Sequence, residues 1–359
     1  MALTAKEVAG KIGVSQATLS LVTNNKPGIS DKTREKVLKE LKERGYEYLL
    51  NEEAFAQQKE NAPQTASGMD TQTVLPSRML GFVTYQVGGE LLGYNSFFPL
   101  IISGIESIAS SEQYNITYIN IAKERLQEGM RQLVSSGCIG YVIFATEMKE
   151  ADLAPFEELG IPFVVLDNYF VGHNHNAVKV NNEQGTYRAV EYLVKKGHKK
   201  IGYLRSGVDI NSFEERYTRA MEAMRYFGCE TPEKYTFEIG YPYKTAFSGM
   251  NELLISQKEL PTAFLGDNDL VLAGAMAAVQ QAGYRLPEDM SFVGYDDRPI
   301  CEWLTPALTS MHLPREHFGG EAVRILIRML HGEKDLNIKA ELNSELIERD
   351  SVAACESIN

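Results

Sequence analysis

The chain has little of what marks a secreted, disulfide-bonded or membrane protein. It holds four cysteines and one tryptophan in 359 residues, and no two cysteines form a CxxC pair. Such scattered cysteines suit packing in a reducing compartment better than a disulfide or zinc framework. The sequence opens on no apolar signal region, and no run is apolar enough to span a membrane. We therefore expect a cytoplasmic protein with no membrane partner.

Motifs for catalysis are also missing. The sequence has no P-loop, no GxSxG elbow and no HExxH motif. Asp296 and Asp297 could suggest a metal, but no neighbouring histidine or carboxylate completes a set of ligands. His173 and His175 are too few to hold zinc, which needs three or four protein ligands. These absences predict a protein that is not an enzyme and uses no metal or cofactor.

What the sequence does have is an uneven distribution of charge. The net charge of the chain is −12, yet the first 50 residues carry nine Lys and Arg against six Asp and Glu. A basic head on an acidic body concentrates the attraction for phosphate groups at one end. With 44% hydrophobic residues, the chain can also bury a large core and hold more than one domain.

The basic head contains an amphipathic pattern that is interrupted once. Thr4 begins a first helix, Gly13 suits a left-handed stop, and Ser15 can cap a second helix. A third helix starts at Asp31, after a Pro-Gly turn. Three short helices with a tight turn between the first two predict a helix-turn-helix. A small helical bundle with no role in DNA binding is the alternative.

The rest of the chain divides into a polar segment and a regular one. Residues 49–78 are rich in Gln, Asn, Ser, Thr and Ala and predict an extended hinge or linker. Beyond it, short β-rich apolar runs alternate with helical patterns, in two successive sets, which predicts two α/β lobes with parallel sheets. The strand-like runs are 80–85, 116–121, 140–145, 162–167, 200–206, 262–267 and 291–297. We therefore expect a DNA-binding domain at 1–48, the linker at 49–78 and a two-lobed body at 79–359.

Acidic and amide side chains follow three of these runs. Asp167, the segment 267–269 and the segment 296–297 each stand where a predicted strand ends. In open parallel sheets, ligands bind beyond the carboxyl ends of the strands. These groups would therefore converge on a cleft between the lobes, although each could instead cap a helix or form a turn.

Several longer segments resemble one family of proteins. The head TAKEVAGKIGVSQATLSLVTNNKPGISDKTREKVLKELKERGY (4–46) resembles the DNA-binding domain of the lactose/galactose repressor family. Four body segments resemble signatures of the same family: GTYRAVEYLVKKGHKKIGYL (185–204), ERYTRAMEAM (215–224), LPEDMSFVGYDD (286–297) and LTSMHLPREHFGGEAVRILI (308–327). The resemblance implies a helix-turn-helix head, a hinge and a periplasmic-binding-protein-like body.

The resemblance also implies a function. It points to a homodimeric, operator-binding transcription regulator, a repressor, controlled by a small sugar or sugar-like effector. A purine, a nucleoside or a phosphorylated compound stays open as the effector. A solute-binding protein for uptake is the rival outside the regulators, but it would carry a signal peptide and no basic head. Double-stranded operator DNA, the effector and a second copy are thus the expected partners.

Carried over by position, the resemblance implies two sets of contact residues. Those expected at DNA are Thr4, Ser15, Gln16, Ala17, Thr18, Ser20, Leu21, Asn24, Lys32 and Arg34. Those expected at the effector are Phe98, Asp167, Ser212, Arg216, Tyr241, Asn268 and Asp296. Carboxylates accept hydrogen bonds from hydroxyls and an arginine donates them, which suits a sugar. Phe98 and Tyr241 could instead be plain core residues, and Trp303 is expected in the core or between the lobes.

Two departures from the family pattern affect the expected DNA contacts. Leu21 stands where many members carry an arginine, so an apolar contact with a thymine methyl is expected there. Phe55 and Gln57 occupy the hinge positions of an arginine and of the leucine that wedges into the minor groove. We therefore expect that the hinge segment does not intercalate into the operator.

Overall fold

The computed structural model of the chain describes residues 4–23, 31–44, 46, 78–88, 98–230, 232–333 and 337–355. The predicted linker up to residue 77, with Phe55 and Gln57, lies outside the described residues, as do the turn at 27–28 and Asn24. Contacts divide the chain into two units, Met1–Val74 and Leu75–Asn359, and each is described by itself. Among the described residues, no helix combines the length and apolar character that a membrane crossing requires.

The first unit holds the three short helices that the head pattern predicts. They are α1 (Ala5–Lys11), α2 (Gln16–Thr23) and α3 (Asp31–Glu43). Gly13 has a φ of 73°, the left-handed value that ends α1. Ser15 caps α2, because its Oγ accepts a hydrogen bond from the backbone N–H of Thr18 at 3.0 Å. The helices share a small core made of Val8, Ala9, Leu19, Val22, Val37 and Leu41.

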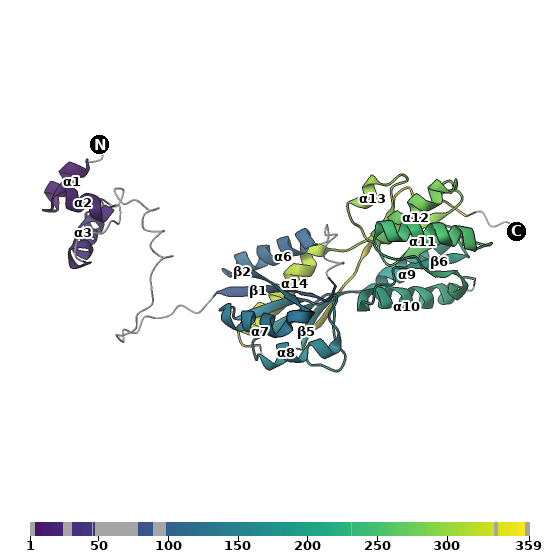
Figure 1. Cartoon of the computed structure of the whole chain (residues 1–359), viewed down its shortest axis with the longest axis horizontal. Coiled ribbons are helices and arrows are strands. Elements are labelled where there is room, and N and C mark those ends of the chain that lie inside the picture. Colours follow the sequence, from purple (N-terminus) through teal and green to yellow (C-terminus); the bar gives the residue numbers. More distant parts are fainter. Residues whose placement is uncertain are drawn as a thin grey trace. The chain divides into compact units, whose positions relative to one another are not determined.

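The second unit folds into two lobes, each built on a six-stranded sheet (Figure 1). In the first lobe the strand order is β11-β5-β4-β3-β1-β2 and every neighbouring pair is parallel. Its strands are β1 (Met79–Gln86), β2 (Asn115–Ala122), β3 (Gly140–Phe144), β4 (Phe163–Leu166), β5 (Asn176–Val180) and β11 (Lys339–Leu342). Its main helices are α6 (Phe98–Ser111), α7 (Leu126–Ser135), α8 (Ala154–Glu158) and α14 (Arg315–Leu330).

The second lobe repeats this plan with one antiparallel edge. Its strand order is β12-β10-β9-β8-β6-β7, and only β12 runs against its neighbour. The strands are β6 (Ile201–Arg205), β7 (Thr236–Glu238), β8 (Ala263–Gly266), β9 (Ser291–Asp296), β10 (Thr309–His312) and β12 (Glu345–Ile347). The helices are α9 (Asn182–Lys195), α10 (Asn211–Tyr226), α11 (Tyr243–Ser256), α12 (Asp269–Gln281) and α13 (Ile300–Trp303).

Helices cover both faces of each sheet, as the buried strands require. Every residue of β3, β8 and β9 is buried, which is typical of central strands in a parallel sheet. In the first lobe α6 and α14 lie on one face and α7 and α8 on the other (Figure 1). In the second lobe α9 and α10 oppose α11 and α12. The predicted α/β class with parallel sheets is confirmed.

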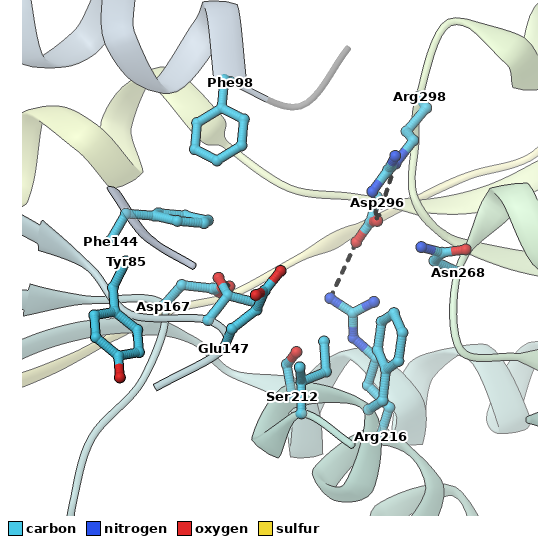
Figure 2. A pocket seen from close by; sticks show the side chains of 13 residues that line it. Tyr85, Phe98, Phe144, Glu147, Asp167, Ser212, Arg216, Asn268, Asp296 and Arg298 are labelled. Atoms are coloured by element: carbon cyan, nitrogen blue, oxygen red, sulfur yellow. Dashed lines mark hydrogen bonds and ion pairs between the residues drawn. The ribbon is translucent and has the colours of Figure 1, made fainter. Parts of the chain in front are cut away.

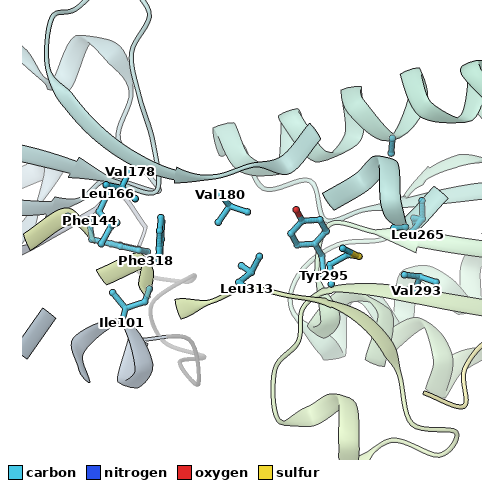
Figure 3. Packing of buried hydrophobic residues seen from close by; sticks show 14 of the residues in the cluster. Ile101, Phe144, Leu166, Val178, Val180, Leu265, Val293, Tyr295, Leu313 and Phe318 are labelled. Carbon is cyan, nitrogen blue, oxygen red and sulfur yellow. The ribbon is translucent and has the colours of Figure 1, made fainter. Parts of the chain in front are cut away.

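The chain crosses between the lobes three times, which the two successive sets of strands in the sequence did not indicate. The crossings run from β5 to α9, from β10 to α14 and from β11 to β12. The C-terminal part therefore returns to the first lobe, where α14 packs along α6 (Figure 1). One hydrophobic cluster runs through the crossings, by way of Val180, Leu313 and Tyr295 (Figure 3). The lobes consequently share part of one core beside the cleft.

Candidate effector cavity and DNA-reading helix

A cavity lies between the two lobes at the carboxyl ends of their strands. It encloses about 510 Å³ of space outside protein atoms, part of it open to solvent. The first lobe lines it with Tyr85, Phe98, Phe144, Thr146, Glu147 and Asp167. The second lobe adds Ile210, Ser212, Phe213, Arg216, Asn268, Asp296 and Arg298 (Figure 2).

Arg216 of α10 is the centre of the second lobe's wall. Its side chain is buried, and its Nε donates to Oδ1 of Asn182 at 3.0 Å. Its Nη1 donates to the backbone carbonyl of Asp267 at 2.7 Å, and its Nη2 pairs with Oδ1 of Asp296 at 3.0 Å. The guanidinium also lies over the ring of Tyr295, 3.9 Å from its centroid. Each nitrogen of Arg216 thus has a partner within the protein.

Asp296 joins Arg216 to a second arginine. Its Oδ2 accepts from Nε and Nη2 of Arg298 at 3.2 and 3.1 Å, so one buried carboxylate holds two guanidinium groups (Figure 2). Behind this pair, Asp269 accepts from Oγ of Ser310 at 2.6 Å and from the backbone N–H of Arg298 at 2.8 Å. Burial, and then the charge of Asp296, raise the pKa of Asp269 to about 7. Ion pairs and hydrogen bonds among its own side chains therefore stabilise the polar wall.

Asp167 is the main acid of the opposite wall. It follows β4 with a φ of 69°, a left-handed value that aspartate tolerates better than most residues. Thr146 Oγ1 donates to its Oδ2 at 2.5 Å. Burial raises the pKa of Asp167 to about 6, although the bond from Thr146 and the charge of Arg216 oppose the shift. The carboxyl group is thus ionised at neutral pH but lies close to its titration range.

Two phenylalanines and a glutamate complete the first lobe's wall. The rings of Phe98, from α6, and Phe144, from β3, meet edge to face with centroids 4.7 Å apart. Glu147 is buried, and its Oε2 accepts from the backbone N–H groups of Val87 and Gly88 at 2.5 and 3.2 Å. The cavity therefore combines an apolar aromatic side with carboxylate acceptors.

Most of the effector residues expected from the sequence meet at this cavity. Phe98, Asp167, Ser212, Arg216, Asn268 and Asp296 all line it. Asn268 also caps α12, with Oδ1 accepting from the backbone N–H groups of Leu270 and Val271. Tyr241 is not among the lining residues, and it packs in the hydrophobic core of the second lobe.

Other lining residues were not anticipated. Thr146 and Glu147 follow a predicted strand, so the rule used for the aspartates would have found them too. Tyr85 ends the predicted run 80–85 and Arg298 directly follows the run 291–297, but only acidic and amide side chains were considered at the strand ends. Trp303 was expected in the core or between the lobes. That prediction is wrong for the single chain, in which the residue is 77% exposed at the end of α13. Among the described residues, no group of three His, Cys, Asp or Glu side chains is placed to hold a metal.

The expected DNA contacts lie on the helix-turn-helix with unequal exposure. Thr4, Ser15, Gln16, Ala17 and Ser20 are exposed, and Thr18, Leu21 and Arg34 are half-buried. Of Lys32 the structure describes the backbone but not the side chain.

Some of these groups already have partners in the head. The Ser15 hydroxyl caps α2, and Nη1 of Arg34 donates to the carbonyl of Leu21 at 3.4 Å. Gln16, Ala17 and Ser20 therefore form the exposed small polar face of α2.

Known proteins match both parts of the chain. Residues 4–47 match the family described as bacterial regulatory proteins, lacI family, and residues 190–352 match a periplasmic binding protein-like domain. The HTH-type transcriptional repressor PurR of Vibrio vulnificus (strain CMCP6) is 28% identical over 353 residues, which cover 97% of this chain and 98% of the relative.

Solved structures share the fold. A transcriptional regulator CelR–cellobiose complex has a TM-score of 0.69 and 23% identity, and the match covers 97% of this chain and 99% of the other. The lac repressor dimer bound to operator and the anti-inducer ONPF has a TM-score of 0.69 and 24% identity, with 99% and 100% of the two chains covered.

Proposed function

Because the chain belongs to the lactose/galactose repressor family and is a ligand-responsive, DNA-binding transcription regulator, we propose that it acts as a dimeric repressor whose effector is a small neutral sugar. The effector would occupy the cavity between the lobes, and α2 would present Gln16, Ala17 and Ser20 to the bases of the operator.

The charge of the cavity is the observation that carries the choice of a neutral sugar. Three carboxylates, from Glu147, Asp167 and Asp296, face two guanidinium groups, from Arg216 and Arg298. Both arginines are already paired with Asp296. The cavity thus offers acceptors to hydroxyl groups and no unpaired arginine to a phosphate. A phosphorylated effector would be repelled by Asp167 and Glu147.

The aromatic side of the cavity supports the same choice. Phe98 and Phe144 offer apolar surface, which can cover the C–H face of a sugar ring while its hydroxyls bond to the opposite wall. Sugar binding also agrees with the cellobiose complex of CelR, a protein of the same fold.

The geometry of the head supports the proposed DNA contacts. A recognition helix reads base edges in the major groove with its N-terminal residues, and the exposed face of α2 lies at its N-terminal half. A dimer doubles the number of contacts and favours a pseudo-palindromic operator.

Thermal-shift screening followed by calorimetry tests the effector class. The melting temperature of the purified full chain is measured with sugars, with nucleosides and with sugar phosphates. The same measurements are made on the Asp167→Asn variant. We expect a neutral sugar to raise the melting temperature, and we expect the substitution to weaken its binding at least tenfold. A chain that responds only to nucleosides or to phosphorylated compounds would contradict the proposal.

A further inference from the structure

Asp297 is the member of the Asp-Asp pair that has no place in the cavity. Its two neighbours in the chain, Asp296 and Arg298, line the cavity, whereas Asp297 is not among the lining residues. It directly follows the last residue of β9 and has a φ of 51°, in the left-handed region. The motif therefore contains a second carboxylate whose role lies outside contact with an effector.

Three segments of the chain hold the polar atoms of Asp297. Its backbone N–H donates to Oγ of Ser310, on β10, at 3.2 Å. Its Oδ2 accepts from Nδ1 of His312 at 2.9 Å, and its Oδ1 lies 2.8 Å from Nη1 of Arg349. Its backbone carbonyl accepts from Nη2 of Arg315 at 2.9 Å. Asp297 thus ties the end of β9 to β10, to α14 and to the segment that follows β12.

Two of these partners stand at the ends of one crossing between the lobes. The chain leaves the second lobe after His312, the last residue of β10, and enters the first lobe at Arg315, the first residue of α14. Leu313, between them, is buried in the core that the lobes share (Figure 3). The bond from Arg315 to Asp297 therefore joins a helix of the first lobe to a residue that adjoins the second lobe's wall.

Beyond Arg315, the contact continues through the backbones of two helices. The carbonyl of Glu316, on α14, lies so close to Gly104 of α6 that a Cβ there would overlap it. α6 begins with Phe98, which lines the cavity from the first lobe. A shift of α14 would therefore move α6 as well, because neither backbone can yield alone.

The order of the domains makes this connection important for a regulator. Most polar groups that line the cavity belong to the second lobe, with Arg216 and Asp296 among them. Along the chain, however, the first lobe stands between the head and the second lobe. The covalent route from the second lobe's wall to the head consequently runs through the first lobe.

One bond of Asp297 is placed to open more easily than the others. The side chain of His312 is 39% exposed, so water can replace its bond to Asp297. Arg349 is more deeply buried and also donates to the carbonyl of Leu308 at 2.9 Å. The crossing can therefore have two arrangements, with the bond between His312 and Asp297 made or broken, and two discrete arrangements are what coupling between sites requires.

We propose that Asp297 is a positioning residue for the effector response, which couples the second lobe's wall to the first lobe through the crossing from β10 to α14. This inference rests on the proposed function, because it places the effector in the cavity between the lobes. An effector that bonds to Asp296 or Arg298 would shift Asp297 between them, and Arg315 would carry the shift to α14. Asp297 itself would not touch the effector.

Asp297→Asn is the variant that tests this role with the least disturbance. Asparagine has the same shape and also tolerates a left-handed backbone. The substitution keeps both backbone bonds of residue 297 and removes only the charge that faces His312 and Arg349.

Two further variants complete the design. His312→Ala removes the same bond from the other side. Asp289→Asn is the matched control, because Asp289 pairs with Arg285 before β9, at the opposite end of that strand from Asp297.

Two titrations of the full chain measure the coupling. Calorimetry gives the affinity for whichever of glucose, galactose, cellobiose, lactose, adenosine and guanosine raises the melting temperature of the wild type most. Fluorescence anisotropy gives the affinity for an operator selected in vitro, with and without that compound, and the ratio of the two values is the response. Because coupling is reciprocal, the bound operator should change the affinity for the compound by the same ratio.

We expect Asp297→Asn and His312→Ala to lower the response at least fivefold. Both should keep the operator affinity of the ligand-free chain within twofold, and neither should weaken binding of the compound more than threefold. Asp289→Asn should resemble the wild type in all three quantities.

The outcomes separate this inference from the proposed function. A full response in Asp297→Asn, or a tenfold loss of its affinity for the compound, overturns the coupling role and leaves the sugar effector standing. A wild type that responds only to a nucleoside overturns the sugar effector, and the same ratios measured with that nucleoside decide the role of Asp297. A wild type that responds to none of the six compounds overturns both.

Discussion

At the scale of single residues, the cavity depends on aspartates in backbone conformations that few side chains adopt. Asp167, Asp296 and Asp297 have φ values of 69°, 98° and 51°, each directly at the end of a strand. Asparagine and aspartate populate this region more readily than other non-glycine residues. Left-handed residues at strand ends concentrate where the chain must aim a polar group into a site. Substitutions to asparagine are therefore the gentlest probes of these positions.

Asp167→Asn should separate stability from effector binding. The folded protein raises the pKa of Asp167 from its ordinary value of 3.8 to about 6, so folding favours its neutral form. The stability of the wild type should consequently fall as pH rises from about 4 through 6 at this site. Asparagine does not titrate, so the ligand-free variant should match the wild type near pH 4 and exceed it at pH 7.5, by up to about 3 kcal/mol.

Thermal unfolding of both proteins at pH 4 and pH 7.5, without effector, measures this difference. The variant should melt several degrees above the wild type at the higher pH only. Equal melting temperatures at both pH values would show that Asp167 is not held against its charged form.

Arg216→Ala should destabilise the body strongly. The substitution removes one of the two guanidinium partners of buried Asp296 together with the bonds to Asn182 and Asp267, and removing one partner from a buried ion pair costs about 3–5 kcal/mol. Arg219→Ala is the matched control, because that side chain is 43% exposed where it pairs with Glu222. The control should lose about 1 kcal/mol or less. Urea unfolding measures both, and similar midpoints would contradict the structural role of Arg216.

This role also changes how Arg216 can serve as a test of effector binding. A response lost in Arg216→Ala could come from a weakened body. Ser212→Ala is a cleaner variant, because Ser212 lines the cavity one turn away and has a small side chain.

At the scale of helices and strands, the sequence predicted what is locally periodic and missed what depends on distant contacts. The runs at 80–85, 140–145 and 291–297 were found because a strand buried on both faces is apolar throughout. The segment 176–180 was not found, because β5 begins with asparagine and ends at a crossing between lobes.

The site was predictable to a similar degree. The ends of β4, β8 and β9 pointed to the cavity, since parallel strands bring their carboxyl ends to one edge. Arg298 directly follows the run 291–297, but its place in the wall depends on its bonds to Asp296, which no spacing indicates. The packing of α14 on α6 likewise depends on chain crossings that no local pattern encodes.

The contact between α6 and α14 should be intolerant of any side chain at Gly104. A Cβ there would collide with the backbone carbonyl of Glu316, which cannot move without moving α14. Gly104→Ala should therefore destabilise the body by about 1–3 kcal/mol, despite the better helix propensity of alanine. Ser103→Ala, at the exposed neighbouring position, should be nearly neutral. Denaturation midpoints measure both, and an unchanged midpoint for Gly104→Ala would refute this packing.

The exposed face of α2 should determine sequence preference and leave general DNA affinity unchanged. Gln16 is exposed and lies at the first position of α2. Gln16→Ala should cost about 1–3 kcal/mol at the specific operator and little on unrelated DNA. Competition binding of the wild type and of Gln16→Ala to both DNAs measures this difference. The change in affinity for unrelated DNA is the control for the change at the operator. Equal losses on the two DNAs would mean that Gln16 contacts the backbone and not a base.

At the scale of the whole molecule, the distribution of charge and the exposure of one aromatic side chain support the proposal of a dimer that binds DNA. The first 50 residues have a net charge of +3 in a chain of net charge −12. The single tryptophan, Trp303, is largely exposed on a short helix that packs beside α12. A large aromatic side chain in water is a common feature of surfaces that associate. The predicted hinge at 51–58 lies outside the described residues, and its failure to intercalate stays a prediction.

The most direct test of ligand-responsive DNA binding is a fluorescence-anisotropy titration of the full chain on an operator selected in vitro. The titration is made at several salt concentrations, with and without the sugar found by thermal shift. We expect the logarithm of the affinity to fall linearly with the logarithm of the salt concentration, because bound Lys and Arg displace counterions from phosphate. We also expect the sugar to change the affinity at least tenfold in the wild type and not in Asp167→Asn. An affinity that is flat with salt, or that the sugar leaves unchanged in the wild type, would contradict the account.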